Sequence, residues 1–295
     1  MKPLHHDAAG TQPQAARAAA AGRPVGGAAP ARLAQAVLHL FRAGMLYLLL
    51  LLLGLSSLAW NCVAALLYPV LPRARGLALG RAFIAHGYGT FWRAAGVLGI
   101  MRIDGECLEP LRGERGLIVV ANHPSMLDAL LVVAHLPRSA CIMKANLMGN
   151  IFLGAGARLA RYIRNDSAHT LVRGAVDDLR HGGQLVVFPE GTRSIGNRVN
   201  PFRPGVTLIA KKAESPIQTV FIDTDSPYLR KGWPIWRLPP LPMVYTLRLG
   251  QRFAPTDDAP GLLQQLEDYF TAELSSATHG TPHACPHSPP PPTSS

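Results

Sequence analysis

The chain has 295 residues, of which 48% are hydrophobic and 16% are charged, and its formal net charge is +11. This length is enough for one large domain with an appendage, and the low share of charged residues favours a membrane-associated protein. The basic excess suits anionic lipid or an acidic substrate; with no zinc-finger spacing, basic heptad helix or aromatic RNA-binding motif, we expect no nucleic-acid partner.

The first part of the chain predicts a tail followed by a membrane-associated region. Residues 1–32 are rich in Ala, Gly, Pro and Gln without hydrophobic periodicity, which is typical of disorder. The uncharged apolar run from Gly44 to Tyr68 is long enough for a membrane-spanning helix of ~20 residues. A re-entrant segment or a soluble core helix remains an alternative. A second apolar stretch, 81–101, predicts an amphipathic helix, so 33–101 is expected to associate with lipid.

From residue 102 to 274 short apolar runs alternate with helix-like segments, which is typical of an α/β domain with three layers and a mostly parallel or mixed sheet. The expected strands are Leu117–Ala121, Ala140–Met143, Leu185–Phe188, Ile217–Ile222 and Met243–Leu249. The expected helices are Met126–His135, Ile151–Ala160, Ala168–Arg180, Val206–Ala213 and Pro260–Leu274. Residues 275–295 are predicted to form a disordered tail.

The cysteines predict neither a disulfide scaffold nor a metal site, because the four of them have no paired or C-x-x-C spacing. A reducing, cytosolic setting therefore suits the domain. Basic residues flank both ends of the apolar run, so the positive-inside rule does not decide its orientation.

A histidine and an aspartate follow the first expected strand, in Asn122-His123-Pro124-Ser125-Met126-Leu127-Asp128. On a continuous helix, residues five apart would lie ~140° apart around the axis and would not meet. They meet if His123 lies in the turn before a helix and Asp128 in its first turn, which Pro124 supports. The carboxylate can then orient an imidazole that acts as a base. Ser125 would cap the helix or donate a hydrogen bond nearby.

A second polar loop follows another expected strand, in Phe188-Pro189-Glu190-Gly191-Thr192-Arg193-Ser194. Gly191 permits a tight backbone path, Thr192 offers a hydroxyl, and Arg193 offers a planar fork suited to phosphate oxygens. Arg193 could instead form an ion pair with Glu190. In open α/β sheets ligands bind at the carboxyl ends of the strands, so both loops are expected at one crevice.

Together the two motifs resemble the glycerolipid acyltransferase superfamily, and most closely its 1-acyl-glycerol-3-phosphate and lysophospholipid acyltransferases. Phe202-Arg203-Pro204-Gly205 is similar to a further motif, and Lys144 with Gly154 stands where the segment before the second motif is expected. The second motif departs from the family pattern, because Asp166 stands where an arginine is usual. Arg161 or Arg164 could substitute for it.

The resemblance implies a membrane-bound O-acyltransferase that moves a fatty acyl group from an acyl thioester to a lysophospholipid hydroxyl, most simply that of 1-acyl-glycerol-3-phosphate. His123 would be the general base and Asp128 its partner. Glu190, Gly191, Thr192, Arg193, Ser125 and Lys144 would line the acceptor site. Backbone N–H groups near the helix start would hold the tetrahedral intermediate.

The implied partners are membrane lipids and an acyl-coenzyme A or acyl carrier protein as co-substrate, with no cofactor and no metal. We expect the protein at the inner (cytoplasmic) membrane with its catalytic domain facing the cytosol. Two alternatives stay open: the same chemistry on an amine-bearing or specialised-pathway lipid, and a lipid thioesterase or esterase. The absence of a G-x-S-x-G nucleophile elbow counts against the hydrolase.

Overall fold

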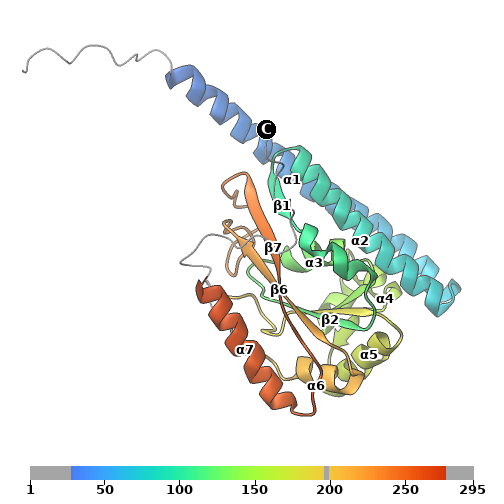
Figure 1. Ribbon diagram of the computed structural model, residues 1–295. Coiled ribbons are helices and arrows are strands. Elements are labelled where there is room, and N and C mark those ends of the chain that lie inside the picture. The colour runs from blue at the N-terminus through green and yellow to red at the C-terminus, as the bar shows by residue number, and fades with distance from the viewer. Residues whose placement is uncertain (1–27, 196–198, 277–295) are drawn as a thin grey trace, which may run out of the picture. The chain divides into compact units, whose positions relative to one another are not determined.

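A computed structural model describes residues 28–195 and 199–276 of the chain (Figure 1). The described residues before Phe41 belong to one unit, and a second unit begins at Phe41. Helix α1, Ala28–Val70, runs from the first unit into the second. The sheet and both polar motifs lie in the second unit.

A seven-stranded mixed sheet forms the centre of this unit, in the order β1-β7-β6-β2-β5-β3-β4. Strands β6, β2, β5, β3 and β4 are parallel, whereas β7 pairs antiparallel with β6 and parallel with β1. The bounds are β1 Met101–Asp104, β2 Leu117–Ala121, β3 Ser139–Lys144, β4 Ile163–Asn165, β5 Gln184–Val187, β6 Ile217–Thr224 and β7 Met243–Phe253.

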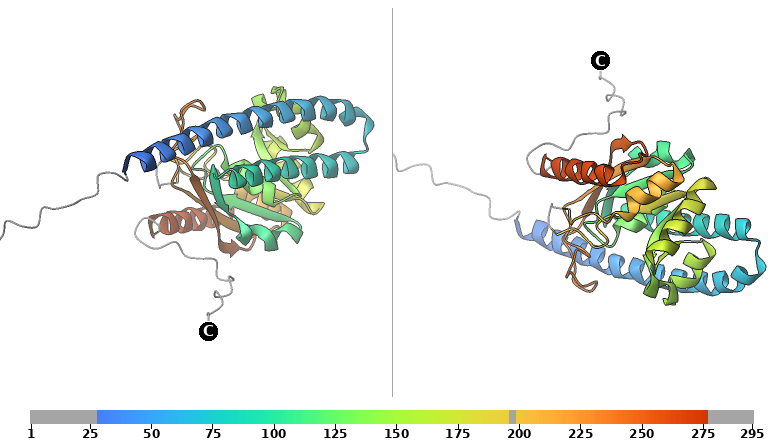
Figure 2. Two further views of the ribbon diagram at one scale, coloured as in Figure 1. Left: turned by 90° about the horizontal axis from the view of Figure 1, so that it is seen from above. Right: turned by 90° about the horizontal axis from the view of Figure 1, so that it is seen from below.

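Helices cover both faces of the sheet, as Figures 1 and 2 show. One hydrophobic core lies under α2 (Arg73–Val97), α3 (Asp128–His135) and part of α1. The other lies under α5 (Ala168–Arg180), α6 (Gly205–Ala213) and α7 (Ala259–Ser276). Side chains of β2 alternate between the two, since Leu117 and Val119 enter the first core whereas Ile118 and Val120 enter the second. The predicted three-layer α/β fold with a mixed sheet is confirmed.

Several predicted elements have different bounds in the structure. The helix predicted from Met126 begins at Asp128, and the one predicted from Ile151 is the short α4, Gly154–Leu159. Strands β1 and β4 were not predicted. Strand β1 has four residues, of which only Met101 lies in the predicted stretch 81–101, and β4 has only three residues, too few to show alternation. Two 3₁₀ helices, Glu106–Gly113 and Ala145–Gly149, complete the unit.

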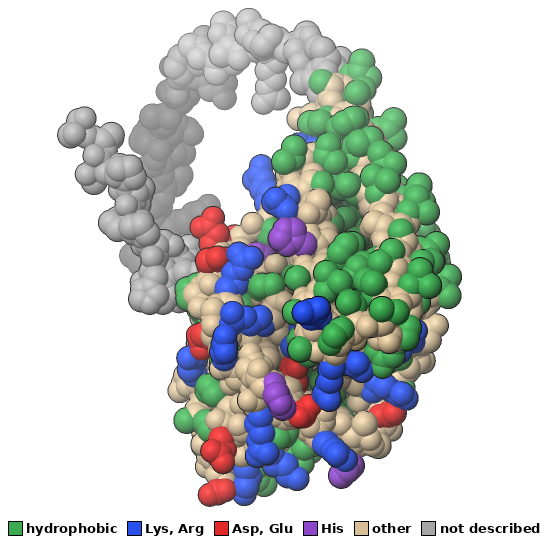
Figure 3. All heavy atoms as spheres, turned by 90° about the vertical axis from the view of Figure 1, so that its right-hand side faces the viewer, with side chains coloured by type: hydrophobic (Ala, Val, Ile, Leu, Met, Phe, Trp, Pro, Cys, Tyr) green, Lys and Arg blue, Asp and Glu red, His purple; other side chains and the backbone are tan. Residues whose placement is uncertain are grey.

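The apolar region forms two long helices. Residues 32–70 of α1 have a mean hydropathy of 2.1, and 11% of their most apolar stretch is buried, so the helix is long and apolar enough to cross a membrane. The predicted helix 81–101 is part of α2, which begins at Arg73 and ends at Val97. Hydrophobic side chains gather over these helices on the face that Figure 3 shows. This exposed apolar surface is consistent with membrane association.

The predicted tails lie mostly outside the described residues. Helix α1 already begins at Ala28, so the last five residues of the predicted tail 1–32 are helical. At the other end, α7 continues to Ser276, two residues into the predicted tail 275–295.

Candidate active site

The two polar motifs follow neighbouring parallel strands, because β2 pairs with β5 with Val120 opposite Val187. Each motif begins directly after its strand, so both lie at the same edge of the sheet. Asn122 fixes the end of β2 to the other neighbour, β6. Its amide Nδ2 donates to the carbonyl of Ile222 at 2.9 Å and its Oδ1 accepts from the Ile222 N–H at 2.7 Å. These two hydrogen bonds fix the residue that precedes His123 to strand β6.

His123 and Asp128 meet across the turn that precedes α3. His123 Nδ1 lies 2.9 Å from Asp128 Oδ2, and the same carboxylate oxygen accepts from the Ser125 N–H at 2.6 Å. The Asp128 side chain is fully buried, whereas 19% of the His123 side chain is exposed. With Nδ1–H donated to the carboxylate, Nε2 faces outward as a proton acceptor. The predicted geometry is therefore present, and the catalytic role remains a prediction.

Burial dominates the electrostatics of Asp128. It raises the pKa of the carboxyl group above its ordinary value, while the hydrogen bond and charge of His123 and the Ser125 N–H oppose that rise. The nearby Glu190 charge raises the pKa further. Asp128 Oδ1 is buried and has no hydrogen-bond partner among the described residues. The hydrogen bonds that offset the cost of burying this carboxylate are therefore made through Oδ2.

Ser125 supports the turn between these two residues. Its hydroxyl donates to the carbonyl of Tyr228 at 3.1 Å and accepts from the Leu127 N–H at 3.2 Å. Helix α3 begins at Asp128, so the cap position belongs to Leu127 rather than to Ser125. The buried hydroxyl therefore ties the turn to the segment after β6 and does not point toward solvent.

The Glu190 side chain joins the two motif loops through hydrogen bonds. Its Oε1 accepts from the His123 N–H at 3.2 Å and from the Ser194 hydroxyl at 2.5 Å. Its Oε2 accepts from the N–H and the side-chain amide of Asn200, at 2.8 and 2.6 Å. Only 3% of Glu190 is exposed. The carboxylate is therefore occupied by the protein, and Glu190 shapes the site by fixing the His123 backbone rather than by touching a ligand.

Arg193 spans the gap between its own loop and the segment after β6. Its Nη1 donates to the carbonyls of Leu229 and Arg230 at 2.8 and 3.0 Å, so it forms no ion pair with Glu190. Nε and Nη2 have no hydrogen-bond partner among the described residues. Gly191 has a φ of +66°, a left-handed conformation that favours glycine, and Thr192 is exposed. The predicted phosphate role of Arg193 is compatible with its free N–H groups and stays a prediction.

Lys144 reaches the same edge of the sheet from a third strand. It ends β3, which pairs in parallel with β5, and its side chain is exposed. It makes no hydrogen bond with the His123 and Glu190 groups in the described part of the chain. The two arginines offered as substitutes in the second motif, Arg161 and Arg164, lie beside β4, which is three strands from β2.

Some contributors to the site were not predicted. Residues 228–230 supply the carbonyls that hold Ser125 and Arg193, and Asn200 fills the second oxygen of Glu190. Tyr245 of β7 adds a hydroxyl 3.4 Å from Ser125 Oγ, and burial raises its pKa to about 12. These residues act through their backbone or from distant strands, so sequence spacing carried no signal for them. Within the described residues, no three His, Cys, Asp or Glu side chains gather as a metal site would require.

Comparison with known proteins finds a match to an acyltransferase family. Residues 102–223 match the family model for the acyltransferases. The chain is 25% identical over 192 residues to a 1-acyl-sn-glycerol-3-phosphate acyltransferase of Pseudomonas aeruginosa, covering 62% of this chain and 72% of that protein. It is 30% identical over 112 residues to one of Helicobacter pylori, covering 36% of this chain and 47% of that protein. The match thus spans about half the length of the latter relative.

A solved structure shares the fold. The crystal structure of the 1-acyl-sn-glycerophosphate acyltransferase PlsC from Thermotoga maritima superposes with a TM-score of 0.59 at 20% identity, covering 85% of this chain and 99% of that one. The fold and the matched segment define an acyltransferase domain. These matches support the predicted resemblance to the glycerolipid acyltransferase superfamily.

Proposed function

We propose that this protein transfers a fatty acyl group from an acyl thioester to the hydroxyl of a lysophospholipid, 1-acyl-glycerol-3-phosphate, with His123 as the general base. One observation carries the proposal: the 2.9 Å contact that joins His123 Nδ1 to the buried Asp128 leaves Nε2 as a partly exposed proton acceptor. The names of the matched relatives support the choice of acceptor.

In this reaction His123 Nε2 takes the proton of the acceptor hydroxyl, and the hydroxyl oxygen attacks the carbonyl carbon of the thioester. Asp128 stabilises the imidazolium that forms. The tetrahedral intermediate then expels the thiolate as the C–S bond breaks, and the imidazolium returns the proton to the sulfur. The new ester and a free thiol are the products. The protein supplies no covalent nucleophile, so a single tetrahedral intermediate suffices.

The oxyanion donors lie elsewhere than the sequence suggested. The backbone N–H groups of residues 125–128 are all engaged, by Asp128, Leu229 and Ser125. Across the crevice, the N–H groups of Thr192 and Arg193 have no hydrogen-bond partner among the described residues. We propose that this loop, in which Gly191 has a left-handed φ of +66°, supplies the oxyanion contact.

The acceptor phosphate is proposed to bind at Arg193, whose Nε and Nη2 can form a bidentate contact while Nη1 stays on the 229–230 backbone. Exposed Lys144 at the same sheet edge would add a second positive charge, and Thr192 a hydroxyl. Glu190 and Ser125 serve the site indirectly, through the backbone they fix.

The donor is proposed to be a thioester of coenzyme A or acyl carrier protein, and the protein is proposed to be bound to the inner (cytoplasmic) membrane with its domain facing the cytosol. The exposed apolar surface of α1 supports membrane attachment. A membrane-attached site would receive its lipid acceptor directly from the bilayer.

The test is acyl transfer by purified His123→Ala, measured by mass spectrometry of lipids after incubation with defined thioesters and lysolipids. Turnover should fall at least ~10²-fold, the scale of general-base catalysis, while the circular dichroism spectrum is unchanged. His169→Ala, an exposed histidine on α5, is the matched control and should keep full activity. Wild-type turnover in His123→Ala would refute the assignment.

A second acceptor class is favoured by one observation, because Asp166 replaces the arginine usual in the second motif and pairs with Arg164 at 2.9 Å. A carboxylate there suits an amine-bearing or specialised lipid better than a second phosphate contact. A panel of phosphorylated and amine-bearing acceptors separates the two. Release of free fatty acid without any acceptor would instead indicate a thioesterase or esterase.

A further inference from the structure

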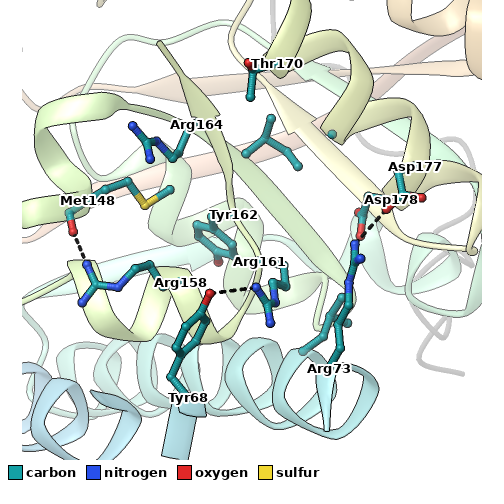
Figure 4. Close-up of a pocket in the computed structure, with 13 residues that line it drawn as sticks. Tyr68, Arg73, Met148, Arg158, Arg161, Tyr162, Arg164, Thr170, Asp177 and Asp178 are labelled. Atoms are coloured by element: carbon teal, nitrogen blue, oxygen red, sulfur yellow. Dashed lines mark hydrogen bonds and ion pairs between the residues drawn. The ribbon is translucent and has the colours of Figure 1, made fainter. Parts of the chain in front are cut away.

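A second polar pocket lies beyond the edge strand β4, between the end of α1, the first turns of α2, α4 and α5 (Figure 4). Its volume is about 310 Å³. Its lining includes two tyrosines and four arginines: Tyr68, Tyr162, Arg73, Arg158, Arg161 and Arg164. We call it the arginine pocket.

The arginine pocket is separate from the His123 site. In the sheet order β2-β5-β3-β4 the two flanking strands are three positions apart, which is about 14 Å at the usual strand spacing. Arg158, Arg161 and Tyr162 also precede β4, so they lie toward its amino end, whereas His123 follows the carboxyl end of β2. The arginine pocket therefore lies apart from the His123–Asp128 pair.

The charge of its wall is unbalanced. Four arginines line it against two aspartates, Asp177 and Asp178, which leaves a formal excess of two positive charges. Asp178 is moreover taken by the buried Arg81, whose Nη2 lies 2.7 Å from its Oδ1. We propose that the arginine pocket binds a phosphate-bearing anion, because a phosphate monoester carries a charge of about −1.5 to −2 and accepts several N–H bonds.

The ion pairs of the arginine pocket compete only weakly with an incoming anion for the guanidinium groups. Arg73 pairs with Asp177 at 2.8 Å and Arg164 with Asp166 at 2.9 Å, but the two arginine side chains are 71% and 55% exposed. Exposed pairs of this kind contribute little free energy, since water solvates both partners well. Their guanidinium groups can therefore turn to an incoming anion at small cost.

Two further residues of the pocket are Arg161 and Tyr162. Arg161 has a φ of +57°, rare for a residue with a Cβ, and its Nη1 contacts the Tyr68 hydroxyl at 3.0 Å with its guanidinium 4.8 Å from the ring centre. The Tyr162 hydroxyl is buried without a hydrogen-bond partner among the described residues, and its ring lies among the arginines in Figure 4.

The phosphate could be borne by a lipid or by a soluble molecule. Tyr68 lines the pocket near the end of α1, where Leu66 and Val70 are exposed, so a lipid tail would lie against apolar surface. A soluble phosphate ester, such as part of the thioester donor, would need only the arginines. The chemistry of recognition is the same in both cases, and the experiment must distinguish the sources.

The test compares the full-length protein with two double variants of equal charge. Arg73→Gln with Arg158→Gln alters the pocket at exposed positions, and Arg115→Gln with Arg173→Gln alters exposed arginines outside it. Co-flotation with phosphatidylcholine vesicles, with and without phosphatidic acid, measures the lipid-borne source. Calorimetric titration with inorganic phosphate and glycerol 3-phosphate measures the soluble source. Circular dichroism checks the fold of each variant.

We expect the pocket variant to lose at least about tenfold in affinity in one of the two assays, as two charge-assisted contacts imply, and the control to change less than about twofold. Loss in co-flotation assigns a lipid phosphate, and loss in calorimetry a soluble one. Equal losses in both variants, or no loss in either assay, would overturn the proposal. A parallel rise in the acceptor KM would also overturn it, because the pocket would then belong to the active site.

Discussion

The His123 site and the arginine pocket both gather polar groups, but they hold them differently. At the His123 site both oxygens of Glu190 are bonded to the protein and the His123–Asp128 pair is fixed by backbone N–H groups. In the arginine pocket two of the four arginines sit in exposed ion pairs. Acyl transfer requires reacting groups in one geometry, whereas binding of an anion requires mainly charge within reach.

The largest effect that would test this contrast is on turnover. Asp128→Asn keeps the size of the side chain but can no longer hold the Nδ1–H tautomer of His123 or stabilise its cation. We expect kcat to fall about 10⁴-fold, with little change in KM, in steady-state assays. Asp104→Asn, an exposed aspartate at the end of β1, serves as the control. A loss under tenfold in Asp128→Asn would mean that the pair only supports the turn.

The next effect is on the free energy of unfolding, compared between the buried Glu190 and the more exposed Asp177. Glu190→Gln turns an acceptor of four hydrogen bonds into a side chain with two donors of its own, so it should lower the free energy of unfolding by about 3 kcal/mol. Asp177→Asn in the arginine pocket should cost less than about 0.5 kcal/mol. Urea unfolding measures both. Similar losses in the two variants would remove the contrast.

Alkaline pH provides a third test, with one buried tyrosine beside the His123 site and one in the first hydrophobic core. Burial raises the pKa of Tyr245, beside Ser125, and of Tyr88, beside Cys141, from 10.0 to about 12. Above pH 10 the unfolded chain loses protons that the folded chain keeps, so the free energy of unfolding falls by about 1.4 kcal/mol per pH unit and per tyrosine until pH 12.

The fall should be measured as the urea midpoint against pH, and Tyr245→Phe or Tyr88→Phe should each flatten it. A slope that neither substitution changes would place the alkaline loss of stability on other groups.

The smallest predicted effect is on acceptor affinity. Arg193→Gln should raise the KM for a phosphorylated acceptor about tenfold, the value of one charge-assisted contact, and leave the KM for an unphosphorylated lysolipid unchanged. Arg115→Gln is the surface control. If both acceptors weaken equally, Arg193 acts through the 229–230 backbone that it holds and not through phosphate.

Local patterns predicted the elements that flank the site. Leu117–Ala121 and Ala168–Arg180 have the predicted bounds, because an uninterrupted apolar run and a well-capped amphipathic helix are strong local signals. Strand β4 was not predicted, because it has only three residues and lies at the edge of the sheet. Such a short strand forms only through pairing with β3, and the sequence does not reveal that pairing. The starts of α3 and α4 shifted for a similar reason, since tertiary contacts hold the preceding turns.

By itself the sequence determined the fold class, the two motif loops, and the requirement that His123 lie in a turn and Asp128 at a helix start. These features depend on local chain geometry and on side-chain type, both of which spacing records. Only the tertiary structure decided that Glu190 faces inward, that the N–H groups at the start of α3 are engaged, and that Arg161 and Arg164 line a separate pocket. Those outcomes depend on which strands become neighbours, and that is a property of the whole packed core.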